Sequence, residues 1–298
     1  MNRRKAEMAL LGNTIIWGTT FVLVKSSLRL ISPVLFLAIR FSLATIALAV
    51  LFGFSRKRKT KAPTAGLPRP QALAVGSVIG LFLFGGYLLQ TVGLQTTTPP
   101  KSAFLTGLAT VMVPLLGALV YQTKPQISEV AGVLAATIGM GLMTLEGPIG
   151  SIARGDLLTF GGAIAFSAHI VATGHFAEQI GFQLLSITQF ASAALSAILL
   201  VWWVETPRIQ WQPLVIWAIL ITAMLCTALA FTIQAWAQNY TTSTRTALIY
   251  ALEPVVAWIT SFFLVGEGLS GRAAAGAVLI LSGVLLVEMK PFNPRQHL

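Results

Sequence analysis

The sequence is poor in charged residues and has a single cysteine. Charged side chains make up 10% of its 298 residues, whereas a soluble domain carries roughly 25%. A soluble fold is excluded, because 55% of the residues are hydrophobic and too few charges remain to cover them. Cys226 has no second cysteine to pair with, so the chain has neither an intramolecular disulfide nor a cysteine-based metal site.

Motifs for catalysis and for cofactor binding are also missing. The sequence contains no P-loop, dinucleotide glycine fingerprint or Ser-His-Asp spacing in a suitable context. His169 and His175 lie near each other, but two histidines without further carboxylates or thiols make a poor metal site. We therefore expect no enzyme activity, no cofactor and no bound metal.

Long uncharged stretches take the place of such motifs. Residues 70–100, 102–123, 157–177 and 209–244 contain no Asp, Glu, Lys or Arg, and a membrane span needs roughly 20 apolar residues. Cutting the chain at charges, prolines and polar clusters predicts an all-α integral membrane protein with ten transmembrane helices. The predicted spans are residues 8–28, 33–54, 71–95, 102–121, 128–145, 156–177, 182–204, 213–238, 245–264 and 270–288.

Basic residues gather at the ends of these stretches and give a net charge of +11. With a cytoplasmic N-terminus, thirteen Lys and Arg residues fall on the cytoplasmic side and five on the other, so both termini are predicted to be cytoplasmic. The basic stretch at residues 55–61 dominates this count and is expected to contact the headgroups of the lipid bilayer, not nucleic acid. The N-terminal segment lacks an obvious cleavage site, which favours an uncleaved first span.

The two halves of the sequence can be aligned with each other. The aligned pairs are Trp17 with Phe166, Arg40 with Gln189, Gln90 with Gln234, and Pro114 with Pro254. Five spans per copy is an odd number, so the second copy must enter the membrane from the opposite side. The alignment predicts two inverted five-helix repeats, residues 1–147 with spans one to five and residues 148–298 with spans six to ten.

The segments WGTTFVLVK, RF, AFLTGL, VPLLGAL, ALEPVVAW and LILSGVLL are spread from Trp17 to Val287. They resemble the drug/metabolite transporter superfamily, specifically its EamA-type members. The resemblance implies a ten-helix carrier in the bacterial inner membrane, with two EamA repeats around a central cavity and a small-molecule substrate. Similar proteins export amino acids, drugs or other metabolites, and aromatic amino-acid exporters of the YddG type are the branch we expect.

Two prolines, Pro114 and Pro254, occupy matching positions in predicted spans four and nine. Each lacks an N–H, so the carbonyls four residues earlier, on Thr110 and Tyr250, lose their helical partner and the helix tends to bend. We predict that both prolines are hinges at the cavity wall. The alternative is a plain structural kink.

Polar residues follow one face of the same two spans. Thr246, Tyr250 and Glu253 are spaced i, i+4 and i+7, and Thr106 and Thr110 form the equivalent stripe on span four. Glu253 is the only carboxylate well inside a predicted span, where an ionisable group is costly unless it is paired or solvated. We predict substrate or proton binding at this stripe, with a purely structural role for Glu253 as the alternative.

Arg40 lies inside predicted span two, roughly 10 Å along the helix from Pro33. Its guanidinium suits either an ion pair with Glu253 or a substrate carboxylate, and the sequence leaves both open. Lys25 lies near the end of span one, where a long side chain is expected to extend towards water.

Aromatic and amide side chains complete the predicted substrate site. Trp17 and Phe21 share a face of span one, Tyr87 lies within one turn of Gln90, and Gln234 is the repeat partner of Gln90. Together they predict an aromatic box with amide groups inside it. Packing between helices is the alternative for the aromatic residues, and interhelical hydrogen bonding for the two glutamines.

His169 lies in the middle of span six and is either a hydrogen-bonding or titrating group of the cavity or a core histidine. Taken together, the residues favour an alternating-access transporter that exports small metabolites, most of all aromatic or neutral amino acids. Proton coupling, exchange and facilitated transport are equally compatible with this pattern. Efflux of cationic drugs, a membrane channel and an intramembrane enzyme are the alternatives.

Overall fold

The structure is a computed structural model that describes residues 3–55, 66–97, 99–122, 126–144, 153–256, 259 and 270–288. Helices account for most of this part of the chain, and Ile31 and Ile209 form an isolated antiparallel bridge. The helices are α1 (Arg3–Gly18), α2 (Phe21–Ser27), α3 (Pro33–Ser55), α4 (Arg69–Leu94), α5 (Pro99–Gly107), α6 (Ala109–Tyr121), α7 (Ile127–Thr144), α8 (Arg154–Ile180), α9 (Phe182–Val204), α10 (Pro213–Ile221), the π-helical turn η1 (Thr222–Leu229), α11 (Ala230–Ala237), α12 (Ser243–Tyr250) and α14 (Gly271–Glu288).

Seven helical stretches within these described ranges are long and apolar enough to cross a membrane. They are Arg3–Ser27, Pro33–Gly53, Arg69–Leu94, Ser102–Tyr121, Arg154–Ile180, Phe182–Val204 and Pro213–Ala237, with shorter apolar helices at Ile127–Leu142 and Gly271–Leu286. The prediction of an all-helical membrane protein is confirmed. The ninth predicted span, 245–264, lies partly outside the described residues, and the count of ten stays a prediction.

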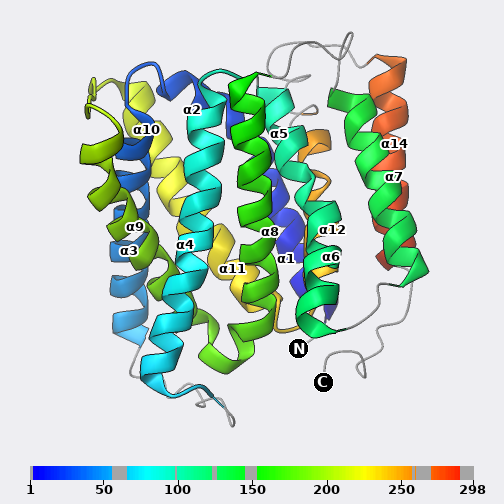
Figure 1. The fold of residues 1–298 in the computed structure, drawn as a ribbon, viewed down its shortest axis with the longest axis horizontal. Helices are drawn as coiled ribbons and strands as arrows, with labels where there is room; N and C mark the ends of the chain where they lie inside the picture. The colour runs from blue at the N-terminus through cyan, green and yellow to red at the C-terminus, as the bar shows by residue number, and fades with distance from the viewer. Residues whose placement is uncertain are drawn as a thin grey trace.

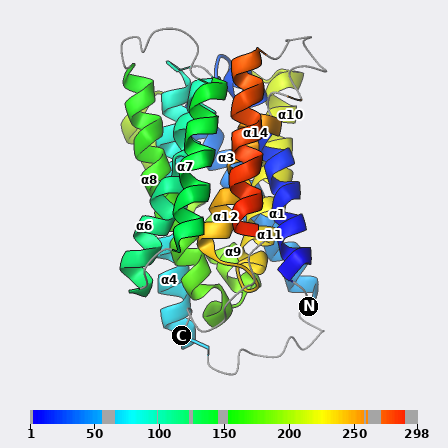
Figure 2. The ribbon, with the colours of Figure 1, turned by 90° about the vertical axis from the view of Figure 1, so that its right-hand side faces the viewer.

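The helices stand side by side in one bundle (Figure 1). α7 packs against α14 at one edge, α3 packs against α9 at the other, and α4 packs against both α8 and α9 between them. The start of α1 and the end of α14 point towards the same end of the bundle, the lower end in Figure 1 and in the turned view of Figure 2. We call this the lower end below.

Apolar side chains lie both inside the bundle and on its outer surface. Phe36, Phe41 and Phe190 are fully buried in the largest apolar cluster, which joins α3, α4, α9 and the η1 region. Outside, large side chains such as Leu81 on α4 and Leu199 on α9 are more than half exposed. An apolar outer surface of this extent suits contact with lipid.

Glycines let the helices approach at the backbone. A Cβ atom on Gly80 would collide with the Gln189 carbonyl of α9, and one on Gly76 would collide with the hydroxyl of Thr188. A Cβ atom on Gly139 of α7 would lie 2.5 Å from a carbonyl of α14. Glycine at all three positions therefore allows the close packing of these helices.

Four of the helical stretches are interrupted. The chain leaves regular helix at residues 19–20 between α1 and α2, at Leu108 between α5 and α6, and at residues 251–252 after α12, and it widens into η1 between α10 and α11. Pro114 lies inside α6, after the break at Leu108, and Pro254 follows the break at residues 251–252. Whether either proline acts as a hinge stays a prediction.

Candidate functional site

A cavity opens where the interrupted helices meet. It encloses about 900 Å³ of empty space, part of it open to solvent, and its lining comes from α1 to α6, α8, η1, α11, α12 and the residues that follow α12. All eleven residues predicted to bind substrate line it: Trp17, Phe21, Arg40, Tyr87, Gln90, Thr106, Thr110, His169, Gln234, Tyr250 and Glu253. Their contact with a substrate stays a prediction.

Arg40 projects from α3 and is 3% exposed. Its Nε donates a hydrogen bond of 2.6 Å to Thr227 Oγ1, and its guanidinium carbon lies 4.2 Å from the centre of the Tyr87 ring. Both Arg40 and Glu253 line the cavity, yet they form no ion pair with each other. Of the two roles left open for Arg40, the ion pair with Glu253 is absent from this structure, and its guanidinium lies at the cavity wall.

Glu253 stands just after the break that follows α12 and is partly buried. The α1 backbone passes close to it, because a Cβ atom on Gly18 would lie 2.9 Å from the Glu253 carbonyl. Glycine is thus needed where α1 crosses this break. The crossing holds the Glu253 backbone against the first span, and the residue lines the cavity together with Tyr250.

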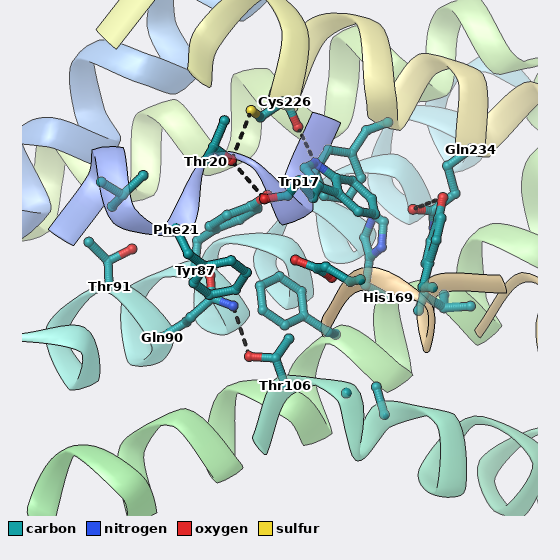
Figure 3. A pocket seen from close by; sticks show the side chains of 18 of the residues that line it. Trp17, Thr20, Phe21, Tyr87, Gln90, Thr91, Thr106, His169, Cys226 and Gln234 are labelled. Carbon is teal, nitrogen blue, oxygen red and sulfur yellow. Dashed lines mark hydrogen bonds between the residues drawn. The ribbon is translucent and has the colours of Figure 1, made fainter. Parts of the chain in front are cut away.

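Aromatic rings form two connected walls of the cavity (Figure 3). Trp17 packs against Tyr250 with ring centres 4.7 Å apart and against Phe231 at 5.0 Å, while Tyr87 packs edge-on against Phe166 at 5.1 Å and Phe231 at 5.9 Å. The indole Nε1 of Trp17 donates to a backbone carbonyl of η1 at 2.9 Å. The rings are therefore fixed in place before any ligand arrives.

Amide groups lie between these walls. Gln90 Nε2 donates to Thr106 Oγ1 at 2.9 Å, which links α4 to α5. Gln234 accepts from the Tyr250 hydroxyl at 3.4 Å and donates to Gln238 at 3.2 Å. Both glutamines join neighbouring helices and also face the cavity, so the two roles considered for them occur together.

His169 also combines its two predicted roles. It lines the cavity, is 1% exposed, and its Nε2 lies 2.8 Å from Gln189 Oε1. Thr110 has its hydroxyl bonded to the Ala247 carbonyl of α12, at 3.2 Å.

Other predicted positions lie away from the cavity. Lys25 is partly exposed, and its ammonium donates to the carbonyls of Leu94, Gln95 and Thr97 at the end of α4. Cations are favoured at such helix ends. Thr246 is fully buried and donates to the backbone carbonyl of Thr242. Groups of three or more potential metal ligands are absent from the described residues.

Among the cavity features that escaped the sequence reasoning, three bear on the argument. Phe166 and Phe231 line the walls, and both had a signal, since Phe166 aligns with Trp17 and Phe231 takes the position of Tyr87 when Gln90 aligns with Gln234. The third feature is the π-helical turn η1, which carries the Thr227 hydroxyl. The hydrophobic periodicity of the sequence does not predict this turn.

Comparisons with known proteins agree with this architecture. The model of the EamA-like transporter family matches the chain twice, at residues 4–145 and 153–289. A solved crystal structure superposes with a TM-score of 0.76 at 21% identity, covering 96% of this chain and 97% of its own, which shows the same fold.

Curated relatives are similar over nearly their whole length. A protein of Archaeoglobus fulgidus described as an uncharacterized transporter is 33% identical over 97% of this chain and 88% of its own. A probable amino-acid metabolite efflux pump of Salmonella typhimurium is 26% identical over 96% of this chain and 95% of its own. With two matches of the family model and a cavity inside a multi-pass bundle, the chain belongs to the EamA-like transporter family of the drug/metabolite transporter superfamily.

Proposed function

We propose that this transporter exports aromatic or neutral amino acids by alternating access. One observation carries the proposal: Arg40 and Glu253, a cationic and an acidic side chain, line a single aromatic-walled cavity without pairing with each other. A zwitterion supplies a partner for each of them. In this proposal the protein is a carrier, and we expect no chemical change to the substrate.

The chemistry of the lining matches the parts of an amino acid. Arg40 suits the α-carboxylate, since guanidinium and carboxylate form paired charge-assisted hydrogen bonds. Glu253 suits the α-ammonium group. The rings of Trp17, Phe231 and Tyr250 offer an apolar and aromatic surface to the side chain.

A cationic drug fits the site less well. An aromatic cavity with one acid suits a cation, but such a ligand brings no anion for Arg40, which is buried. A desolvated guanidinium without a counter-charge is costly. The family relative from Salmonella typhimurium, a probable amino-acid metabolite efflux pump, points in the same direction as the cavity.

We also propose the topology that alternating access requires. The chain has ten spans in two inverted repeats, residues 1–147 and 148–298, with both termini in the cytoplasm of a bacterial cell and the spans in its inner membrane. The two matches of the family model support the repeats. Reporter fusions test the topology, and a periplasmic signal at either terminus contradicts it.

Counterflow in liposomes tests the substrate. Liposomes that contain the purified protein and are preloaded with L-phenylalanine should accumulate labelled L-phenylalanine. L-phenylalaninamide, which lacks the carboxylate, should compete for this uptake at least about tenfold less well, as expected for a lost hydrogen bond to a charged group. Arg40→Gln should remove this discrimination. Arg272→Gln, at an exposed arginine of α14, is the matched control.

Glu253→Gln separates the ammonium site from a proton site. Loss of both counterflow and net flux assigns Glu253 to substrate binding, whereas retained counterflow with loss of the response to a pH gradient assigns it to proton coupling. Equal competition by the amide and the amino acid in the unmodified protein contradicts the proposed substrate class.

A further inference from the structure

The span that contains Cys226 is widened by a π-helical turn. In a regular α-helix the Ala230 N–H would donate to the Cys226 carbonyl, four residues back. Here it donates to Leu225 O, five residues back, and also to Thr227 O. Single π-helical turns within α-helices occur often at functional sites.

Two neighbouring residues of this turn, Cys226 and Thr227, bond side chains that line the cavity. The Cys226 carbonyl accepts the indole N–H of Trp17 at 2.9 Å, as Figure 3 shows. The next residue, Thr227, accepts the Arg40 Nε–H at 2.6 Å. One widened turn thus holds an aromatic ring and the guanidinium that the cavity presents.

The Thr227 hydroxyl is oriented for this task. It donates its own proton to the Thr222 carbonyl, five residues back in the same turn, at 2.8 Å. Its lone pairs are thereby left to accept from Arg40. Thr227 is 0% exposed and Arg40 is 3% exposed, so water does not replace this bond.

The bond also limits how Arg40 can receive a ligand. A carboxylate binds a guanidinium at two points either through Nε and one terminal nitrogen or through both terminal nitrogens. Because Thr227 occupies Nε, the first arrangement is blocked and the second remains. The Tyr87 ring at 4.2 Å covers one face of the guanidinium plane.

We infer that Thr227 is a positioning residue of the transport site, which acts through Arg40 to set the end-on binding of a carboxylate. The inference rests on the proposed function, in which Arg40 receives the substrate carboxylate. It assigns a role to the π-helical turn that neither the cavity lining nor the family membership assigns.

Thr227→Val tests the inference because it removes the hydroxyl and keeps the branched shape. In the liposome counterflow assay, we expect the half-saturating concentration of L-phenylalanine to rise about tenfold, while competition by L-phenylalaninamide changes less than twofold. Thr227→Ser keeps the acceptor and should behave like the unmodified protein. A merely structural role would weaken both ligands alike and would not distinguish Ser from Val.

Thr232→Val is the matched control. Thr232 lies in the same span, and its buried hydroxyl has no hydrogen-bond partner within the described part of the chain. The change should leave the ratio between amino acid and amide as it is. If Thr227→Val does not yield monodisperse protein, Thr227→Ala replaces it and the same ratio decides.

The outcomes separate the two proposals. If Thr227→Val and Thr227→Ala keep the normal ratio while Arg40→Gln loses it, the positioning role is refuted and the proposed function stands. If Arg40→Gln itself keeps the ratio, the carboxylate site is refuted, and the role of Thr227 falls with it.

Discussion

An ion cluster at the lower end of the bundle gives a quantitative prediction. Glu7 of α1 is 7% exposed and lies 3.1 Å from Arg3 Nε and 3.5 Å from Arg245 of α12, which is 6% exposed. Its carboxylate also accepts the Thr241 hydroxyl at 3.2 Å. The cluster therefore ties the start of the first span to the start of α12, a helix of the second half.

Glu7→Gln should destabilise the protein strongly. Removing one partner of a buried pair costs about 3–5 kcal/mol, because the other, desolvated charge loses that counter-charge. The low end of this range, about 3 kcal/mol, applies here because Arg3 is 27% exposed, so water screens the attraction between Arg3 and Glu7. Arg245→Gln should cost less, since Glu7 keeps Arg3 as a counter-charge.

Thermal melting of the purified protein in detergent measures these changes. The double variant Glu7→Gln, Arg245→Gln should be no less stable than Glu7→Gln alone, because the second change removes the guanidinium whose ion pair with Glu7 the first change has already broken. Arg3→Gln is the control and should lower stability by at most about 1 kcal/mol. Strictly additive effects of the two single changes would refute the coupling.

Three further predictions concern other parts of the bundle. Gly139→Leu should force α7 away from the backbone of α14 and reduce the yield of folded protein. Gly12→Ala should not reduce the yield, because a Cβ atom added at Gly12 meets nothing within 4 Å. Size-exclusion profiles of the purified variants compare the two. Lys25→Met should lower the melting temperature, because carbonyls at the end of α4 lose their charged donor. Gln90→Ala and Gln234→Ala should each weaken counterflow while membrane expression stays normal, and normal transport by both would show that the cavity amides are dispensable.

The membrane spans were predictable because their signal is composition. A stretch without charges has no alternative to burial in lipid or protein, so the predicted span 182–204 coincides with α9 at Phe182–Val204. The start of the first helix was harder to predict: α1 begins at Arg3, whereas the predicted span begins at residue 8. The polar side chains Arg3 and Glu7 belong to this helix, because they pair with each other one turn apart.

Polar residues inside apolar stretches predicted the cavity for a related reason. Such residues are costly in lipid and must face the interior of the bundle, so Arg40, Gln90 and Glu253 were found without knowledge of the packing. Partnerships between distant residues were not predictable. The contact of Arg40 with Thr227 depends on a π-helical turn, and the pair of Glu7 with Arg245 joins opposite halves of the chain.

The coincidence of the broken helices with the cavity has a physical cause. A carbonyl that loses its helical partner inside a membrane must find another donor, because lipid offers none. At η1 this donor comes from another helix: the Cys226 carbonyl, which does not accept the Ala230 N–H, accepts the Trp17 indole N–H instead. Side chains also bond carbonyls elsewhere in these spans: Asn13 bonds the Ala230 carbonyl at 2.7 Å, and Thr110 bonds the Ala247 carbonyl, which also accepts the Ala251 N–H within the helix. The break at η1 thus requires a polar group in the interior, and that group, the Trp17 indole, also lines the space in which a substrate would bind. A substitution that removes the Trp17 indole N–H should therefore disturb the helix break and the cavity together.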